Sequence, residues 1–333
     1  MAAAKHRTVV VTGASAGVGR ATALVFARHG WRVALIARDQ AGLESARREI
    51  EQAGGTAMAI SADVADADAV FAAADTIAEN WHSIDVWVNN AMATIFSPVF
   101  DMSPEEFRRA TEVTYLGYVF GTMAALRHMR RRSAGTIVQV GSALSYRAIP
   151  LQSAYCGAKF AIRGFTDALR SELQHERSDI RVTMVQLPAV NTPQFEWGRN
   201  KLGFRTQPMP PIHQPEAAAA AIFRATAAAP RESWVGFASV KVIIGNMVFP
   251  GLLDRVLARG GFSGQITSEP KPVADDDNLF TAVSGKHAAH GRFDDRARTN
   301  AWSYNPAAVR GLIAVGALGL IVVCTALGAL IFR

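Results

Sequence analysis

Apolar and polar positions form a regular series along the chain, in which short apolar runs alternate with longer stretches of helical period. Short runs rich in β-branched residues predict buried strands, and apolar residues at helical spacing predict amphipathic helices. The predicted strands span 8–12, 32–37, 56–61, 84–88, 136–140, 181–187 and 233–238. Strict alternation of strands and helices predicts an α/β fold with a doubly wound parallel sheet covered on both faces. Ligands of such sheets bind at the carboxyl ends of the strands.

A glycine-rich loop follows the first predicted strand and opens the next helix. Glycines let backbone N–H groups approach a pyrophosphate, and the helix N-terminus adds partial positive charge. An ordinary glycine-rich turn is the alternative, but the strand before the loop and the helix after it favour a dinucleotide site. The expected contacts are Gly13, Ser15, Gly17, Val18 and Gly19.

The end of the second predicted strand indicates which dinucleotide binds. Ala37 occupies the position where an acidic residue would hold the ribose hydroxyls of NAD, and Arg38 follows it. An arginine here accommodates the 2′-phosphate of NADP. We therefore expect NADP(H), with Ser15 as a second candidate phosphate contact. Asp39 is predicted to be the N-cap of the next helix.

Polar residues also follow the third and fourth predicted strands. Asp63, followed by Val64, is expected to meet the adenine, and Asn90 and Ala91 are expected to line the ribose side of the cofactor. A helix cap or a turn is the alternative interpretation of both pairs.

The spacing Ser142-x12-Tyr155-x3-Lys159 predicts an acid/base device. Tyr155 and Lys159 are four residues apart, so on a helix they share one face. A free phenol has a pKa of about 10, and moving it toward 7 requires roughly 4 kcal/mol of phenolate stabilisation. A neighbouring ammonium supplies part of that energy. A surface lysine beside a half-buried tyrosine is the alternative.

The charge and the cysteines exclude some functions. The net charge of +7 comes from scattered Lys and Arg residues, and no nucleic-acid-binding motif is present, so nucleic acid is not expected as a partner. Cys156 and Cys324, the two cysteines, have neither metal-ligand spacing nor the placement of a structural disulfide. His287 and His290 have no further ligand near them, so we predict solvated histidines and no metal site.

The last part of the chain predicts a membrane attachment. Apolar periodicity disappears over 263–304, which indicates a polar linker, and 305–333 is predicted to be a single-pass anchor. Residues 311–332 are uncharged and would form a helix of about 33 Å, against a hydrocarbon core of about 30 Å. Basic residues before this segment outnumber Arg333 after it, which favours a cytoplasmic catalytic domain. These residues are Arg292, Arg296, Arg298 and Arg310.

Two segments are predicted to surround a substrate. Residues 193–215 are rich in Pro, Asn, Gln and aromatic residues, which is typical of a lid. Residues 240–258 are apolar around Pro250 and Gly251. They are predicted to form a kinked helix that lines the pocket or rests on a membrane, with ordinary core packing as the alternative.

The sequence resembles the short-chain dehydrogenase/reductase family over about residues 5–260. The resemblance is carried by Thr12-Gly13-x3-Gly17-x-Gly19, Asn89-Asn90-Ala91 and Ser142…Tyr155-x3-Lys159. It implies a Rossmann fold in a domain of residues 1–262, a nicotinamide cofactor, and a homodimer or homotetramer. It implies Tyr155 as the acid/base, Ser142 as the partner of the substrate oxygen, and Lys159 as the group that lowers the tyrosine pKa and holds the nicotinamide ribose. It also places Pro188, Val190 and Thr192 at the cofactor, with Thr192 at the carboxamide.

Three positions depart from the family pattern. Met92 stands where the family has Gly, Ala189 replaces the usual Gly after Pro188, and Thr114 replaces the Asn that serves as the fourth catalytic residue. A hydroxyl can still hydrogen-bond a water, so we expect a proton relay through Thr114. The resulting hypothesis is a membrane-anchored, NADP(H)-dependent oxidoreductase that interconverts a carbonyl and an alcohol on an apolar or lipid substrate. The alternative is an NADP(H)-binding, membrane-tethered scaffold or sensor without turnover.

Overall fold

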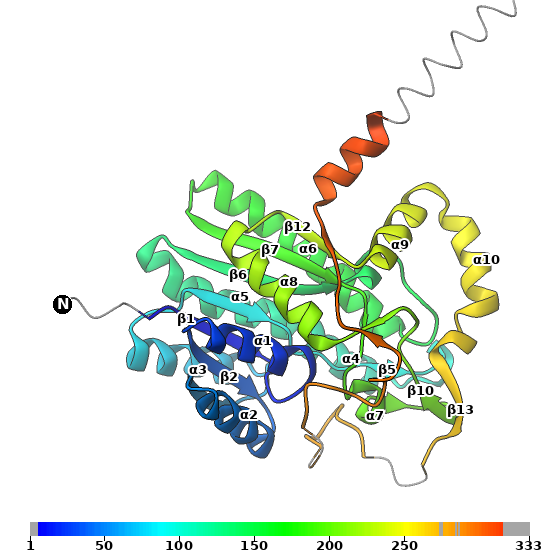
Figure 1. The fold of residues 1–333 in the computed structure, drawn as a ribbon, viewed down its shortest axis with the longest axis horizontal. Helices are drawn as coiled ribbons and strands as arrows, with labels where there is room; N and C mark the ends of the chain where they lie inside the picture. The colour runs from blue at the N-terminus through cyan, green and yellow to red at the C-terminus, as the bar shows by residue number, and fades with distance from the viewer. Residues whose placement is uncertain (1–5, 273–275, 284, 286, 316–333) are drawn as a thin grey trace, which may run out of the picture.

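The fold is built on one twisted sheet (Figure 1), seen in a computed structural model that describes residues 6–272, 276–283, 285 and 287–315. Within these residues the main sheet has eight strands in the order β15-β12-β7-β6-β4-β1-β2-β3. Its strands are β1 (Thr8–Thr12), β2 (Arg32–Ala37), β3 (Thr56–Ser61), β4 (Val86–Asn89), β6 (Gly135–Ser142), β7 (Ile180–Leu187), β12 (Glu232–Val235) and β15 (Ser303–Tyr304). Neighbouring strands pair in parallel except β15, which runs antiparallel to β12. The predicted doubly wound parallel sheet is confirmed, and it carries an antiparallel edge strand.

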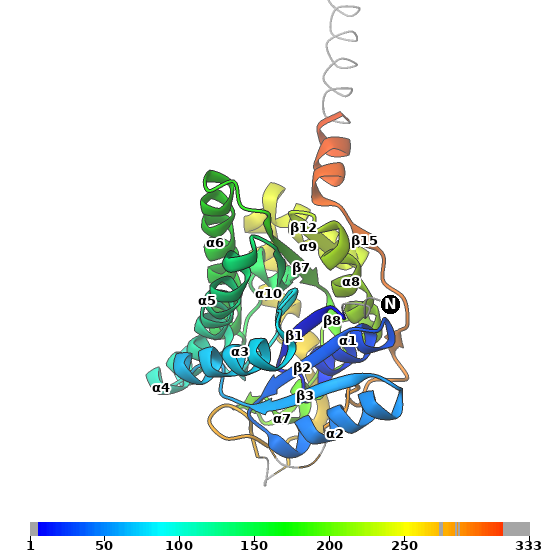
Figure 2. The same cartoon turned by 90° about the vertical axis from the view of Figure 1, so that its left-hand side faces the viewer.

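Helices cover both faces of the sheet (Figure 2). One layer contains α1 (Gly17–Arg28), α2 (Gln40–Gln52) and α8 (Pro215–Ala228), and the other contains α3 (Ala67–Trp81), α5 (Gly117–Met129) and α6 (Ser153–His175). The strands are buried between the layers. In β1, Val9 and Val11 pack into one apolar cluster and Val10 into the other. Burial on both faces explains why these strands are continuous apolar runs in the sequence.

The helical part of residues 103–132 is divided in two. The first part, α4 (Pro104–Thr111), begins at a capping box, in which Ser103 and Glu106 each bond the other's backbone N–H. A π-helical turn, Glu112–Leu116, then separates α4 from α5. Such a turn shifts the helical register, so it changes which residues of the following helix face the sheet.

The segment predicted as a lid folds onto the domain in short elements. Residues 193–215 contain α7 (Gln194–Trp197), β9 (Arg199–Asn200), β10 (Phe204–Thr206) and β11 (Ile212–His213). β9 pairs with β5 (Ile95–Phe96), and β11 pairs with β8 (Ala189–Val190). The kinked helix predicted at 240–258 is present as α9 (Phe237–Val248) and α10 (Pro250–Gly260), because Pro250 begins a new helix.

The predicted polar linker belongs to the folded domain over its described residues. β13 (Ile266–Pro270) pairs with β10, β14 (Ala297–Arg298) pairs with β11, and β15 extends the main sheet. We call residues 276–298, without 284 and 286, the strap. Leu279 and Phe293 of the strap are fully buried. The prediction failed here because isolated apolar residues and backbone hydrogen bonds leave no periodic pattern.

The predicted membrane anchor falls mainly outside the described residues, which end at 315. Cys324 lies in that outer part as well. Residues 306–315 are helical. In the part of the chain that the structure describes, no helix has the length and apolar character needed to cross a membrane.

Candidate active site

A cavity of about 510 Å³ lies at the carboxyl ends of the central parallel strands. This volume falls within the range of about 300–1,000 Å³ that is typical of ligand pockets. Thr114 and Gly19 are the predicted site residues that do not line it. The others all do: Gly13, Ser15, Gly17, Val18, Arg38, Asp63, Val64, Asn90, Ala91, Ser142, Tyr155, Lys159, Pro188, Val190 and Thr192.

The glycine loop is shaped by close backbone contacts. Gly13 has a φ of +65°, and its N–H donates to the Ile36 carbonyl at 2.7 Å. A Cβ at Gly19 would lie 2.1 Å from the Gly13 carbonyl oxygen, so only glycine lets α1 begin this close to β1. Gly19 therefore acts through the shape of the loop rather than as a cavity contact.

The cavity fits a dinucleotide at this loop. Gly17 also has a positive φ, +57°, and a Cβ there would lie 3.2 Å from the Thr192 methyl group. Without that carbon, the backbone at the start of α1 can approach Thr192 and line the cavity. A helix N-terminus is a suitable anion site, and here the Gly17 N–H donates to the Ala288 carbonyl of the strap at 2.9 Å.

Asn90 links the loops that follow β1 and β4. Its side-chain amide donates to the Thr12 carbonyl at 3.0 Å, while its backbone N–H donates to the Thr12 hydroxyl at 2.9 Å. The same hydroxyl accepts from the Ala91 N–H at 3.1 Å. The hydrogen bonds of Asn90 therefore fix the two loops that form this part of the cavity wall.

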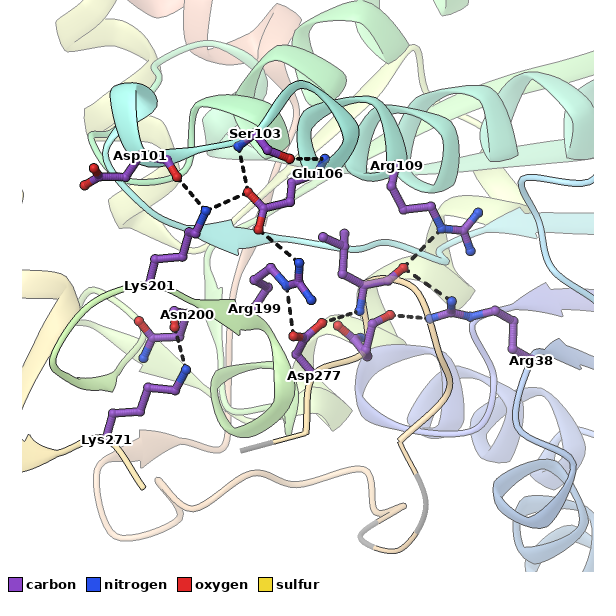
Figure 3. A network of polar contacts seen from close by, with 12 residues as sticks. Arg38, Asp101, Ser103, Glu106, Arg109, Arg199, Asn200, Lys201, Lys271 and Asp277 are labelled. Carbon is purple, nitrogen blue, oxygen red and sulfur yellow. Dashed lines mark hydrogen bonds and ion pairs between the residues drawn. The ribbon is translucent and has the colours of Figure 1, made fainter. Parts of the chain in front are cut away.

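The end of the cavity at which we expect the adenosine contains Arg38 and Asp63, and we call it the adenosine end. Arg38 donates to three strap carbonyls: Asn278, Leu279 at 3.4 Å and Phe280 at 3.1 Å (Figure 3). Burial lowers the pKa of Arg38, and the nearby Asp63 carboxylate opposes that change. Asp63 forms an ion pair with Arg109 and accepts from the Ala65 N–H at 3.0 Å. Asp63 therefore stabilises the turn after β3 as well as lining the cavity.

Ser142, Tyr155 and Lys159 meet where β6 ends and α6 begins. Ser142 and Lys159 are buried, and Tyr155 is partly exposed in the cavity wall. The Ser142 hydroxyl oxygen accepts a hydrogen bond from the Leu144 N–H at 3.1 Å. Burial raises the pKa of Tyr155, while the interaction with Ser142 opposes that rise. The Lys159 ammonium nitrogen lies 5.5 Å from the centre of the Tyr155 ring.

Tyr118 is a site residue that the sequence did not indicate. Its phenol accepts a hydrogen bond from Lys159 at 2.9 Å and donates to the Val140 carbonyl at 2.9 Å. Lys159 also donates to Val140 at 2.7 Å. Among the described residues, Tyr118 therefore occupies the place beside Lys159 that we expected a relay from Thr114 to reach.

Thr114 forms its hydrogen bonds with the backbone of Ala93 and not with Lys159. Its hydroxyl donates to the Ala93 carbonyl and accepts from the Ala93 N–H, both at 2.9 Å. It lies in the π-helical turn, which sets it against the loop after β4. The predicted relay through Thr114 would require this pair of bonds to open.

The electrostatics of Lys159 follow from its burial. Its side chain is almost inaccessible to solvent, and burial lowers its pKa to about 7. The two neutral acceptors, Tyr118 and Val140, do not offset the loss of hydration. The ammonium therefore titrates near neutral pH when no cofactor or phenolate lies beside it.

Comparison with known families shows which family the chain belongs to. A family model described as short chain dehydrogenase matches residues 7–201. The chain belongs to the short-chain dehydrogenase family. The predicted family and the oxidoreductase class are thus confirmed.

Relatives of this short-chain dehydrogenase occur in bacteria and mammals. It is 30% identical over 304 residues to the uncharacterized oxidoreductase YxnA of Bacillus subtilis, covering 90% of this chain and 82% of the relative. It is 34% identical over 192 residues to the putative oxidoreductase SadH of Mycobacterium tuberculosis, covering 58% and 70% of the two chains. It is 33% identical over 194 residues to dehydrogenase/reductase SDR family member 7B of Bos taurus, covering 56% and 59%.

Solved structures share the fold. A metagenomic short-chain oxidoreductase in complex with NADP superimposes with a TM-score of 0.55 at 27% identity, covering 65% of this chain and 89% of that one. The alcohol dehydrogenase of Thermococcus sibiricus, complexed with 5-hydroxy-NADP, gives a TM-score of 0.60 at 28% identity, covering 69% and 95%. The predicted fold is therefore one that both solved relatives adopt.

Proposed function

We propose that this short-chain dehydrogenase is an NADP(H)-dependent oxidoreductase that interconverts a carbonyl group and an alcohol, with Tyr155 as the acid/base. The observation that carries the proposal is the convergence of Ser142, Tyr155 and Lys159 on the cavity that the glycine loop and Arg38 also line. The cofactor assignment agrees with the NADP ligands of the two solved relatives. When bound, the nicotinamide supplies or accepts the hydride.

Ser142 orients the substrate oxygen. Its hydroxyl oxygen already accepts from the Leu144 N–H, so its own proton is available to donate. A carbonyl or alkoxide oxygen beside it accepts that hydrogen bond. Tyr155, on the adjacent wall, then gives its proton to the oxygen during reduction and takes it back during oxidation.

Lys159 controls the ionisation of Tyr155. An ammonium group has three N–H donors, and two of them bond Tyr118 and Val140. The third is left for a ribose hydroxyl of the cofactor or for the Tyr155 oxygen. A phenolate at Tyr155 would raise the affinity of Lys159 for its proton, and the cation would in turn favour the phenolate. The two groups therefore titrate as a coupled pair.

Turnover separates the proposed enzyme from a binding scaffold. We would incubate the full chain with NADPH and a panel of apolar ketones and aldehydes. The absorbance of the reduced nicotinamide measures the consumption of NADPH. Consumption of NADPH that depends on the carbonyl compound supports the oxidoreductase. Tight NADPH binding with no turnover of any compound supports the scaffold instead.

Arg38→Asp is expected to reverse the cofactor preference. Hydrogen bonds to a charged group contribute about 1.5–3 kcal/mol, so NADPH should bind about 10- to 100-fold more weakly, while NADH binding changes little. Equilibrium titration of each coenzyme measures the effect. Arg48→Asp is the matched control, because Arg48 is an exposed arginine on the neighbouring α2. Equal losses for both coenzymes would contradict the role of Arg38.

The substrate is proposed to be apolar. The side of the cavity beyond Tyr155 is lined by Met209 and by side chains of α9 and α10, namely Val242, Leu253, Val256 and Leu257. An aliphatic wall of this kind favours a hydrocarbon body over a charged or sugar-like one. The reacting oxygen would then be held by the polar end of the cavity.

A membrane source of the substrate is proposed from the outer surface of the same helices. Val248, Phe249 and Leu252 surround the junction of α9 and α10 and are each more than half exposed. In Figure 1 and Figure 2 this junction lies on the same side of the molecule as the helix at 306–315. That helix leads into the uncharged stretch 311–332. An anchor there would bring the junction to the bilayer and keep the preceding domain on the cytoplasmic side.

A chain that ends at Arg310 is expected to lose most of its membrane association. This truncation keeps β15 and the contact of Arg310 with the Trp234 ring, so the domain should stay folded. Flotation with phosphatidylcholine vesicles measures the bound fraction. Remaining binding should disappear on adding Phe249→Ser and Leu252→Ser, but not with Phe100→Ser, an exposed phenylalanine before α4. Unchanged flotation of the truncated double variant would contradict the proposed membrane contact.

A further inference from the structure

The strap crosses the adenosine end of the cavity and is fixed on both sides of it. At one end, Asp277 pairs with Arg199 at 2.9 Å, and Arg199 bonds the buried Glu106 of α4 at 2.9 Å (Figure 3). At the other end, the buried Phe293 donates its N–H to the Asn191 side chain at 3.1 Å. The described residues between these points therefore have a defined position over the cofactor site.

His287 is docked on the glycine loop through its backbone. Arg20 of α1 donates to the His287 carbonyl at 2.7 Å and to the Ser15 carbonyl at 3.4 Å. The next carbonyl, that of Ala288, accepts from the Gly17 N–H at 2.9 Å. These contacts place His287 beside Ser15, the second candidate phosphate contact.

The imidazole of His287 fills the space between the glycine loop and the start of α2. Only 9% of its side chain is exposed, and it lies 5.6 Å from the Trp197 ring. A Cβ at Gly42 would lie 2.7 Å from the Cγ and Nδ1 atoms of the imidazole, so the ring packs directly on the first turn of α2. The ring also lines the cavity.

The polar atoms of this imidazole lack well-formed partners. Nε2 lies 2.9 Å from a carboxylate oxygen of Asp39, but neither ring nitrogen makes a hydrogen bond of good geometry to a described residue. A buried ring nitrogen without a partner is costly, because it loses its bond to water. A ligand oxygen in the cavity would supply the missing acceptor.

The charges of Arg38 and Asp39 determine which ligand fits beside His287. Arg38 stands at the cavity wall where the 2′-phosphate of NADP is proposed to bind, and Asp39 is the next residue. A phosphate dianion there would be repelled by the Asp39 carboxylate. An imidazolium in contact with the Asp39 carboxylate would offset this repulsion and offer an N–H to the phosphate. The uncharged 2′-hydroxyl of NADH gains neither benefit.

We propose that His287 is a second cationic contact for the 2′-phosphate, so that the strap and Arg38 together select NADP(H) over NAD(H). This inference rests on the proposed NADP(H) function. It assigns part of the cofactor specificity to a residue of the strap, more than 240 positions after the glycine loop. His287 acts in cofactor recognition and has no part in the proton transfer.

His287→Gln tests the contact, with His290→Gln as the matched control. His290 lies in the same strap and bonds Glu216 and Asp294 at 2.9 and 2.6 Å, so it anchors the strap outside the cavity. We expect His287→Gln to raise the dissociation constant of NADPH about tenfold and that of NADH less than twofold. His290→Gln should change both constants by the same factor.

The binding of fragments makes the measurement independent of turnover. Calorimetric titration with 2′,5′-ADP and with 5′-AMP compares ligands that differ only in the 2′-phosphate. His287→Gln should weaken only the first. Equal losses for both fragments, or no loss for either, would overturn the proposal.

Two further results distinguish a failure of the role proposed for His287 from a failure of the proposed NADP(H) function. If the wild-type chain does not prefer NADPH, the cofactor assignment itself fails, whatever the variants do. If the wild type prefers NADPH and Arg38→Asp removes the preference while His287→Gln leaves it intact, only the role of His287 fails. Should His287→Gln not fold, His287→Lys places a cation at this position and must retain the preference for NADPH; its loss would count against the proposal.

Discussion

Tyr155→Phe is expected to lower kcat by about 10²- to 10⁴-fold, the usual contribution of a general acid or base. The substitution removes only the phenolic oxygen, so the affinity for NADPH should change less than twofold. The best compound of the carbonyl panel serves as substrate, and steady-state kinetics give kcat. Tyr304→Phe is the control, because Tyr304 lies in β15 and does not line the cavity.

The test is best made in the direction of carbonyl reduction. Burial raises the pKa of Tyr155, so the phenol is protonated at neutral pH before cofactor binds. A protonated phenol is the form that reduction of a carbonyl needs. A Phe variant that keeps wild-type kcat would show that another group moves the proton.

Lys159→Met is expected to abolish most activity and to change the pH dependence of stability. The folded pKa of about 7 lies well below the ordinary value of 10.5. Between these values the unfolded chain binds a proton that the folded chain has released, so Lys159 makes the free energy of unfolding rise with pH. The slope from this one group is about 1.4 kcal/mol per pH unit. Below the folded pKa, both states hold the proton and the full destabilisation is present.

Urea denaturation of both proteins between about pH 7 and pH 10 measures the difference. The free energy of unfolding of the wild type, minus that of Lys159→Met, should increase with pH in this window. Lys241→Met, at an exposed position on α9, should show no such change. A flat difference for Lys159→Met would mean that the folded Lys159 keeps an ordinary pKa.

The same ionisation predicts how cofactor binding depends on pH. If the ammonium holds the nicotinamide ribose, NADPH should bind more weakly as the pH rises above about 7, the pKa of Lys159 in the free protein. The weakening should be absent in Lys159→Met, which has no proton to lose there.

The parallel sheet could be predicted from the sequence because its strands are buried on both faces. Val9, Val10 and Val11 each pack into an apolar cluster, and this two-sided burial requires a continuous apolar run. The approach of Ser142, Tyr155 and Lys159 to the glycine loop could also be predicted, because these residues stand near strand ends at the spacing that the proposed chemistry requires. Such constraints act locally and are visible in one stretch of chain.

The surroundings of Lys159 could not be predicted in this way. The π-helical turn at Glu112–Leu116 breaks the regular helical register on which spacing arguments depend. Thr114 therefore meets Ala93, and the Tyr118 phenol reaches Lys159. A regular helix through this stretch would have given a different pairing.

The contacts of the strap could not be predicted from the sequence, for a different reason. Arg38 bonds carbonyl oxygens of Asn278, Leu279 and Phe280, which are the same atoms in every amino acid. The sequence predicts a solvated His287 because the partners of this residue are distant in sequence, whereas the structure buries it against Asp39. Backbone acceptors and single long-range contacts carry no periodic signal.

The position of β15 near the end of the chain affects how the domain folds during synthesis. The parallel strands β1 to β12 are synthesised first, but the strap and Ser303–Tyr304 emerge near the end of translation. Domains generally fold as units, so this domain is completed only after its last strand has left the ribosome. A prematurely ended chain would thus expose the edge of β12 and hold the adenosine end of the cofactor less firmly. Bound coenzyme, which stabilises only the state that binds it, would favour the survival of full-length chains over truncated ones.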